Sequence, residues 1–245
     1  MKNLIEVKNI KKNYGKKEAV KGISFNVQEN EILGLLGPNG SGKTTTIGML
    51  LGLLKPTSGQ IFIDNLKLEN HRIEILEMIN FISPYVELPK KLTVKQNLNV
   101  YAKLYKVQNI EERIEYLSEK LRIEELLDSI TGELSSGQKN RVSLAKSLIN
   151  KPEILLLDEP TASLDPDIGD YVRSYVQSYK SKNKITILLA SHNMAEVERL
   201  CDSVIMMKKG KIIDQGTSKE IISRHGRANL EETFLKIVRS EDEVA

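Results

Sequence analysis

The chain has 245 residues, of which 40% are hydrophobic and 28% charged, a composition typical of a globular protein with one large α/β domain or two small ones. Its 36 Lys and Arg against 33 Asp and Glu give a net charge of +3, too small to argue for a nucleic-acid partner. No apolar run approaches the roughly 18 residues that span a bilayer, and the start lacks the apolar core of a secretory signal. The single cysteine, Cys201, cannot form an internal disulfide, so we expect a reducing, cytoplasmic setting.

Residues 1–35 alternate short apolar and polar runs, as in 4–7 and 22–27, and this alternation predicts strands of a small sheet. Residues 61–64 continue the pattern. A cluster of lysines lies within residues 11–17. We interpret them as solvated turn lysines, with contact to an anionic phosphate or lipid as the alternative.

Residues 37–44, Gly-Pro-Asn-Gly-Ser-Gly-Lys-Thr, match the pattern G-x-x-x-x-G-K-[ST] at every fixed position. An apolar run over 31–36 precedes them, typical of a buried parallel strand, and helix-forming residues 44–54 follow. A strand, a glycine-rich turn and a helix in this order gather backbone N–H groups and a helix N-terminus around one point. The pattern therefore predicts binding of a nucleoside triphosphate, and a chance Gly-Lys turn is the alternative.

The residue types of this loop suit phosphate chemistry. Its glycines at 37, 40 and 42 lack a Cβ, so the backbone can curl closely around phosphate oxygens. We expect Lys43 to reach the β- and γ-phosphates and the Thr44 hydroxyl to hold Mg²⁺.

Residues 84–150 change in character, because apolar side chains recur at helical spacing and predict a mainly helical insert. Within it, residues 134–138 (Leu-Ser-Ser-Gly-Gln) open a second helix. Ser135 and Ser136 are good N-cap residues, and Gly137 lets backbone N–H groups approach an anion. Taken alone, this pentapeptide favours an ordinary helix cap.

Strand-like apolar runs return at 153–157, 185–189 and 203–207, with a predicted helix over 167–182. Strands that alternate with helices indicate a parallel sheet with helices on both faces. Ligands bind such sheets at the carboxyl ends of the strands, where the phosphate loop also lies.

Asp158 and Glu159 follow directly after the apolar run that ends at residue 157. Held at the end of a rigid strand, Asp158 can help to coordinate Mg²⁺, and Glu159 can act as a general base on the attacking water. Adjacent acids also occur at helix N-termini, where the dipole favours them. The apolar run before them favours the catalytic interpretation.

Taken in order, these motifs resemble those of the ATP-binding cassette (ABC) ATPases. Residues 162–165 (Ala-Ser-Leu-Asp) look like the family's D-loop, and residues 190–192 (Ala-Ser-His) resemble its switch-histidine loop. Tyr14 matches the aromatic residue that stacks on adenine. The resemblance runs from Tyr14 to about residue 216, and all six motifs in the right order are highly specific.

The resemblance implies an α/β fold of the P-loop NTPase type, with a mainly parallel core sheet, a small N-terminal antiparallel β-subdomain and a helical signature subdomain. It implies one ABC ATPase domain over residues 1–245. The nucleotide-binding core would occupy 1–83 and 151–220, the helical subdomain 84–150, and a C-terminal helix and tail 221–245.

The resemblance also implies roles for single residues. The catalytic residues would be Glu159, His192 and Lys43, and the Mg²⁺ ligands Thr44 and Asp158. The nucleotide contacts would be Tyr14, Gly37, Asn39, Gly40, Ser41, Gly42, Lys43, Thr44, Thr45, Ser135, Gly137 and Gln138. In the family, two cassettes close head to tail over ATP, so the signature residues would face a nucleotide held by a second subunit, and Asp165 would lie at that interface.

The chain departs from the family pattern at two places. Ser136 stands where the family most often has Gly, and its small hydroxyl is expected to be tolerated. A loop that usually carries Gln, which helps to organise Mg²⁺, has Pro84 near that position, and proline offers no side-chain ligand. Ser83, Tyr85 or a water molecule could replace the missing contact, and the sequence does not choose among them.

The implied function is that of an ATP-binding and ATP-hydrolysing subunit of an ABC transporter, peripheral on the inner face of the cell membrane. It would drive export of an unknown substrate through separate integral membrane subunits by ATP-dependent dimer closure. The second ATPase subunit would be an identical copy or a paralogue, and no nucleic-acid partner is expected.

Two other functions compete with this interpretation. A non-hydrolysing ATP-binding regulator fits the altered loop, but Lys43, Asp158, Glu159 and His192 argue against it. A soluble ABC ATPase acting on ribosomes or DNA usually carries two cassettes or long coiled-coil insertions, and this chain has neither. Apolar residues at helical spacing in 230–238 predict a helix that packs back on the domain, with docking of a partner as the alternative.

Overall fold

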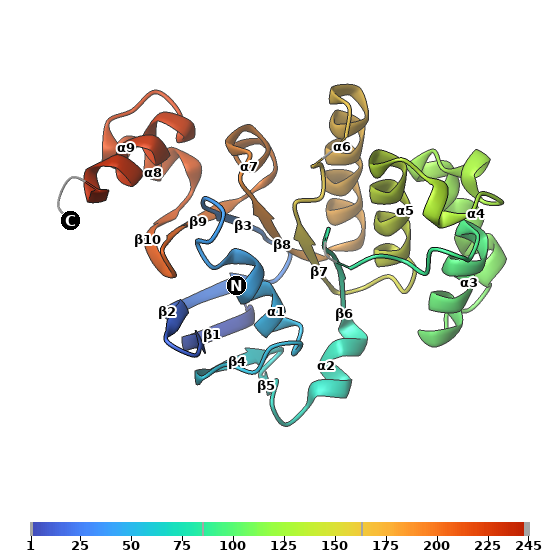
Figure 1. Ribbon diagram of the computed structural model, residues 1–245, viewed down its shortest axis with the longest axis horizontal. Coiled ribbons are helices and arrows are strands. Elements are labelled where there is room, and N and C mark those ends of the chain that lie inside the picture. Colours follow the sequence, from blue (N-terminus) through green and yellow to red (C-terminus); the bar gives the residue numbers. More distant parts are fainter. Residues whose placement is uncertain (1, 85, 163, 243–245) are drawn as a thin grey trace. The chain divides into compact units, whose positions relative to one another are not determined.

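A computed structural model describes residues 2–84, 86–162 and 164–242, and Figure 1 traces their helices and strands. The chain forms two compact units, Met1–Leu76 with Thr186–Ala245, and Glu77–Ile185. Within the described residues, no helix combines the length and the apolar character needed to cross a membrane.

The first unit contains an antiparallel sheet with the spatial order β2-β1-β4-β5. Its strands are β1 (Asn3–Tyr14), β2 (Lys17–Gln28), β4 (Ser58–Ile63) and β5 (Leu66–Lys67). Ile5 and Val7 of β1 are buried with the half-buried Glu6 between them, the period of a strand with one face on the core, and the pairing of β1 with β2 shifts in register on both sides of this stretch. The predicted N-terminal strands are confirmed.

A second set of strands in this unit is mainly parallel. β3 (Ile32–Leu36) lies between β8 (Thr186–Ser191) and β9 (Ser203–Lys208) and runs parallel to both, while β10 (Lys211–Gly216) is antiparallel to β9. Every residue of β3 and β8 is buried, as expected of parallel strands that are covered on both faces. The predicted parallel strands near these positions are confirmed.

The helices of the first unit are α1 (Lys43–Leu50), α7 (Met194–Leu200), α8 (Ser218–His225) and α9 (Leu230–Asp242), and α2 (Arg72–Met78) runs from this unit into the next. α1 is shorter than the predicted helix over 44–54. Gly52 adopts a φ of +62°, a left-handed conformation that ends helices at low cost only in glycine.

The C-terminal helices pack back on their own unit. Leu230, Phe234 and Ile237 of α9 are buried together with Val197 of α7 and Met206 of β9. This arrangement confirms the predicted packing of the C-terminal helix. The side chain at position 238, also expected in this contact, lies outside the described part.

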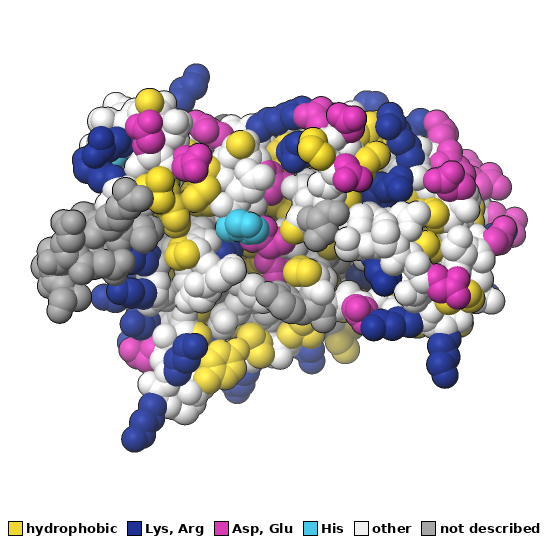
Figure 2. Space-filling view, turned by 45° about the horizontal axis from the view of Figure 1, so that its top comes forward, with side chains coloured by type: hydrophobic (Ala, Val, Ile, Leu, Met, Phe, Trp, Pro, Cys, Tyr) yellow, Lys and Arg dark blue, Asp and Glu magenta, His cyan; other side chains and the backbone are white. Residues whose placement is uncertain are grey.

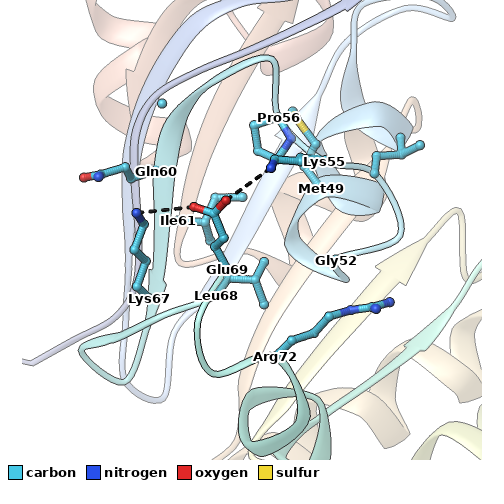
Figure 3. A pocket seen from close by; sticks show the side chains of 12 residues that line it. Met49, Gly52, Lys55, Pro56, Gln60, Ile61, Lys67, Leu68, Glu69 and Arg72 are labelled. Carbon is cyan, nitrogen blue, oxygen red and sulfur yellow. Dashed lines mark ion pairs between the residues drawn. The ribbon is translucent and has the colours of Figure 1, made fainter.

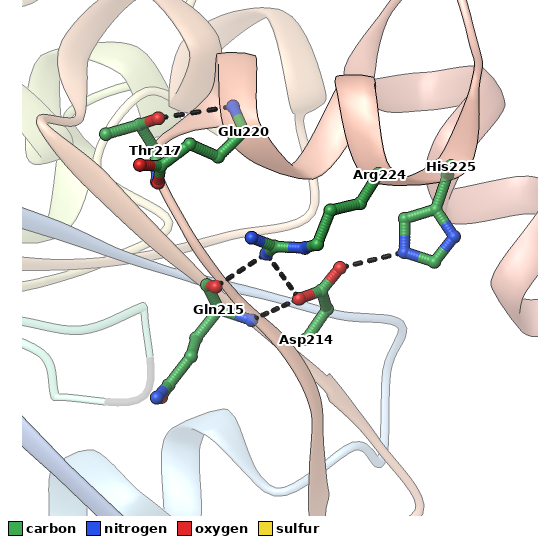
Figure 4. A network of polar contacts seen from close by, with 6 residues as sticks. All are labelled: Asp214, Gln215, Thr217, Glu220, Arg224 and His225. Carbon is green, nitrogen blue, oxygen red and sulfur yellow. Dashed lines mark hydrogen bonds and ion pairs between the residues drawn. The ribbon is translucent and has the colours of Figure 1, made fainter.

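A polar network ties α8 to β10, as Figure 4 shows. Asp214 accepts hydrogen bonds from Arg224 (2.6 Å) and lies 2.8 Å from Nε2 of His225, while Arg224 also donates to the Gln215 carbonyl at 2.7 Å. Burial alone would raise the pKa of Asp214, but Arg224 and His225 outweigh it and hold this pKa below its ordinary value. The carboxylate is therefore a charged anchor for the last turn of α8.

The second unit combines two parallel strands with the helical segment. Its strands are β6 (Ile79–Ile82) and β7 (Ile154–Asp158), and its helices are α3 (Val94–Leu104), α4 (Ile110–Leu121), α5 (Ser136–Leu148) and α6 (Pro166–Asn183), with short 3₁₀ turns at Glu124–Leu126 and Thr131–Glu133. α3, α4 and α5 pack on one another, and α5 also packs on β6. Leu98, Leu117 and Leu144 are fully buried. The predicted helical insert is confirmed.

This division of the chain differs from the expected one, which assigned 77–83 and 151–185 to the nucleotide-binding core. In the structure these segments belong to the second unit, because β6 pairs with β7 and packs under α5. Packing does not decide which residues serve the nucleotide, so the expected assignment of core and helical subdomain stays a prediction.

The packing of α9 is open to a direct test. Phe234→Ala removes a side chain that is only 7% exposed, and we expect the free energy of unfolding to fall by about 3 kcal/mol. Leu235→Ala, on the neighbouring and 40% exposed position, should cost less than about 1 kcal/mol. Urea denaturation of both variants measures the difference, and equal losses would contradict this packing.

Candidate functional site

Two predicted site segments leave neighbouring strand ends in the first unit. β3 and β8 are parallel and aligned so that Leu36 pairs with Ser191. The next residue on each strand is Gly37 of the phosphate loop and His192. Strand register therefore brings these two segments to the same sheet edge, where α/β sheets bind ligands.

The phosphate loop is held by close backbone contacts at its glycines. A Cβ on Gly37 would lie 2.4 Å from the Met207 carbonyl oxygen. Gly42 has a φ of +110°, and a Cβ there would lie 2.9 Å from the carbonyl oxygen of Ala19. Other residues would clash at both positions, so the loop shape depends on these glycines.

Lys43 lies within the loop that it was predicted to serve. It is 6% exposed, and its ammonium donates to the carbonyls of Gly37 (2.5 Å) and Pro38 (3.3 Å). Gly42 is the N-cap of α1, whose first turn has no acidic residue, so the N–H groups and the dipole of α1 favour an anion. The hydroxyl of Ser41 is buried with no hydrogen-bond partner in the described part of the chain, as expected of a group that awaits a ligand.

The remaining loop candidates lie around this centre. Asn39, Gly40 and Thr44 are exposed, and Thr45 is half-buried. Tyr14, at the end of β1, is 48% exposed, and the Lys12 ammonium lies 5.3 Å from its ring centroid. This exposure leaves the Tyr14 ring accessible to a nucleotide base, and its stacking on adenine stays a prediction.

The segment around His192 is rigidly framed. Ser191 ends β8, and its hydroxyl donates to Glu196 at 2.7 Å and accepts from the Asn193 N–H at 3.1 Å. Asn193 in turn caps α7 by accepting from the N–H of Glu196. His192 is exposed between these fixed neighbours, and its contact with a γ-phosphate stays a prediction.

A second pair of strand ends carries the predicted acids in the second unit. β6 and β7 are parallel and aligned so that Ile82 pairs with Leu157. The following residues are Ser83 and Asp158, and the Ser83 hydroxyl donates to Oδ2 of Asp158 at 3.3 Å. Of the substitutes for the missing Gln, Ser83 thus contacts the predicted metal ligand, while Tyr85 lies outside the described residues.

Glu159, the residue after Asp158, has a backbone conformation that is uncommon for a residue with a side chain. Its φ is +52°, a left-handed conformation that is costly for a residue with a side chain and clusters at functional sites. Its carbonyl accepts from the Ala162 N–H at 3.2 Å. Asp158 is 2% exposed and Glu159 half-buried, so both acids are held by the local fold.

A hollow of about 330 Å³ in the second unit brings these acids together with part of the signature segment. It is lined by Ser83, Asp158, Glu159, Ser136, Lys139 and Asn140, among others. The sequence interpretation did not include Lys139 and Asn140. They follow Ser136 by three and four residues on α5, so helical spacing could have placed them on its face.

The signature residues form a helix cap. Ser135 is the N-cap of α5; its hydroxyl accepts from the Gln138 N–H at 3.3 Å, and the Gln138 side chain accepts from the Ser135 N–H at 2.8 Å. This is a capping box, as the alternative interpretation expected. The roles of Ser135, Gly137 and Gln138 toward a nucleotide stay predictions.

Asp165 stands at another helix start. It is the N-cap of α6 and exposed, and its side chain makes no capping hydrogen bond. Its carboxylate is thus available at the surface, and its place in a dimer interface stays a prediction. Residue 163 of the same motif lies outside the described residues.

A further hollow, of about 230 Å³, lies in the first unit beside β4 and β5 (Figure 3). Glu69 pairs there with Lys55 at 3.2 Å and Lys67 at 3.3 Å. No predicted site residue lines it.

On the face in Figure 2, basic and acidic side chains are interspersed, as on an ordinary solvated surface.

The comparison with known proteins agrees with the motifs. The family described as ABC transporter matches residues 20–162. The chain is 37% identical over 220 residues to the Nod factor export ATP-binding protein I of Burkholderia lata, covering 89% of this chain and 72% of that protein. It is 34% identical over 251 residues to the linearmycin resistance ATP-binding protein LnrL of Bacillus subtilis, covering 97% and 79%.

Solved structures show the same fold. The ATP-binding subunit of an ABC transporter superposes with a TM-score of 0.89 at 29% identity, over 96% of this chain and 99% of that one. A dimeric ATP-binding cassette in a post-hydrolysis state with ADP and phosphate superposes with a TM-score of 0.81 at 25% identity, over 87% and 98%. The predicted P-loop NTPase fold is thereby confirmed, and this chain belongs to the ABC transporter family as an ATP-binding subunit that hydrolyses ATP.

Proposed function

We propose that the chain is the ATPase subunit of an exporter, peripheral on the inner face of the cell membrane and bound to separate integral membrane subunits. The observation that carries this proposal is the 37% identity with an export ATP-binding protein along 89% of the chain. The linearmycin resistance relative supports the same direction of transport. The two relatives are named for different compounds, so the cargo of this chain is left open.

On the phosphate side, the loop after β3 would cradle the triphosphate with its backbone N–H groups and the start of α1. Lys43 now donates to two loop carbonyls. Phosphate oxygens are stronger acceptors because they are charged, so the ammonium would turn to them when ATP binds. The buried Ser41 hydroxyl would gain a partner in the same step.

Mg²⁺ would be held by Thr44 and Asp158 together with phosphate oxygens and water. The hydroxyl and carboxylate oxygens are the hard donors that Mg²⁺ prefers. The Ser83 hydroxyl donates to the Asp158 carboxylate, and in this role it would replace the family's Gln.

Hydrolysis would then need a base and a second cassette. Glu159 follows Asp158 on the same rigid strand end, where its carboxylate can accept a proton from the attacking water. The start of α5 on a second subunit, an identical copy or a paralogue, would meet the γ-phosphate through Ser135 and Gly137. Closure on ATP and opening after hydrolysis would shift the populations of two states and move the membrane subunits.

Glu159→Gln tests the base. The amide has nearly the shape of the carboxylate but accepts no proton, so ATP binding should persist while kcat falls by at least about 100-fold. Steady-state turnover and calorimetric ATP titration measure the two effects, and size-exclusion chromatography should show ATP-bound dimers. Glu153→Gln, at an exposed position before the same strand, is the matched control. Unchanged turnover of Glu159→Gln would refute the role.

Ser83→Ala tests the replacement for the missing Gln. Loss of one hydrogen bond to a charged group, worth about 1.5–3 kcal/mol, should loosen Asp158 and raise the Mg²⁺ concentration needed for half-maximal turnover. Affinity for ATP in the absence of Mg²⁺ should not change. Ser181→Ala on the exposed part of α6 is the control. If Ser83→Ala leaves the Mg²⁺ dependence unaltered, a different group organises Asp158.

The proposed partners are testable in the native membrane. Affinity purification of the tagged chain from detergent-solubilised membranes should retain an integral membrane protein in stable amounts. Identification of that protein by mass spectrometry also addresses the cargo. Recovery of the chain with ribosomes or DNA instead would contradict the proposed transport role.

A further inference from the structure

Lys146 is buried in an unusual setting in the second unit. It lies in the last turns of α5 and is 7% exposed. Its ammonium donates to the Asn80 side-chain oxygen at 3.2 Å and the Phe81 carbonyl at 3.3 Å. It also lies 4.6 Å from the ring centroid of Phe81 and 5.2 Å from that of Tyr101. Within the described part of the chain, no carboxylate forms an ion pair with it.

This setting is costly for a charge. A buried cation is normally paired with an anion, because desolvation disfavours the charged form. Here neutral oxygens and aromatic faces, which attract cations through their quadrupole, are the partners. Burial lowers the pKa of Lys146 to about 8, so the side chain is still protonated at neutral pH.

The contacts of Lys146 join α5, which begins at the signature residues, to β6, which ends beside Ser83. Asn80 and Phe81 belong to β6, and Ser83 follows that strand directly. Asn80 is itself fixed, since its amide donates to Asn150 beyond the end of α5 at 2.9 Å. Because α5 is one continuous helix, a contact that holds its C-terminal turns against β6 also limits the movement of its N-terminal end, where Ser135 lies.

We propose that Lys146 is a positioning residue for ATP hydrolysis, whose ammonium holds β6 against the signature helix and so keeps the Ser83 hydroxyl beside Asp158. The proposal rests on the roles proposed above for Ser83 and Asp158. Tyr101 completes the cage from α3, so three elements meet at one cation. A loss of this contact lets β6 shift relative to α5 without touching the phosphate loop.

Lys146→Met tests the proposal, because methionine fills a similar volume without the charge. Replacing a buried charge by an apolar side chain is often neutral or stabilising, so the melting temperature should be kept or raised. Affinity for ATP without Mg²⁺ should stay, while kcat falls at least about tenfold, since small misplacements of catalytic groups are costly. Lys146→Arg keeps the charge and the donors and should restore most of kcat.

Lys103→Met on the exposed side of α3 is the matched control and should keep turnover within about twofold of the wild type. The proposal is overturned if Lys146→Met keeps wild-type kcat. It is also overturned if kcat, ATP affinity and melting temperature fall together, because that pattern indicates a structural role alone. Absence of turnover in the wild type would overturn both this inference and the proposed function.

The pH dependence of kcat tests the same point on folded proteins, even where the methionine variant fails to fold. Between about pH 7 and 9 the wild type should lose kcat as Lys146 loses its proton, whereas Lys146→Arg stays charged and should show a flatter profile. The titratable group that contacts Lys146 from α3 is Tyr101, and Arg113 of α4 donates to the Ile149 carbonyl just beyond α5, while β6 contributes only the neutral Asn80 and Phe81. The remaining charged groups of α3 and α4, such as Lys103, form no hydrogen bond or ion pair with Lys146 within the described residues. Parallel profiles of the two proteins would overturn the proposal.

Discussion

The alignment of parallel strands is the constraint on which the site depends. Residues paired across parallel strands end at the same edge, so whatever follows them is brought together regardless of distance in the sequence. The pairing of Leu36 with Ser191 places the phosphate loop beside His192, and the pairing of Ile82 with Leu157 places Ser83 beside Asp158. A slip of one residue in either pair would turn alternate side chains to the opposite face. Burial of the apolar side chains of these strands opposes such a slip. The strand register therefore determines both the packing of the core and the placement of the predicted site residues.

Under the proposed replacement of the family's glutamine by Ser83, this constraint limits the serine more strongly than it would limit a glutamine. A glutamine side chain spans a larger gap and can adjust through three torsions, whereas a serine hydroxyl sits one carbon from the backbone. Its reach to Asp158 therefore depends on where the backbone of β6 ends. The 3.3 Å separation between the Ser83 hydroxyl and Asp158 leaves little margin, because a hydrogen bond weakens steeply with distance. Any group that anchors β6 therefore affects the position of Asp158, the proposed Mg²⁺ ligand.

Much of this arrangement could be predicted from the sequence, because its determinants are local. Period-two alternation, buried apolar runs and the spacing of glycines identify the strands, the phosphate loop and the order of the acids. The early end of α1 at Leu50 was not predicted, because the helix-forming residues around Gly52 gave no sign of its left-handed conformation. The contact of Ser83 with Asp158 and the cage around Lys146 depend on side chains from separate elements that only tertiary packing brings together. No window of sequence contains that information.

The neutral cage suggests why a charge persists in a position where an apolar side chain would cost less. Apolar contacts tolerate small sliding motions, since dispersion is non-directional. Hydrogen bonds are directional, so the contacts of the Lys146 ammonium with Asn80 and Phe81 favour a single alignment of β6 on α5. Buried polar networks that are fully satisfied specify one arrangement at a cost in free energy. Under the proposed mechanism, in which the short Ser83 side chain orients the Mg²⁺ ligand Asp158, that specificity would serve hydrolysis, a function which stability alone does not explain.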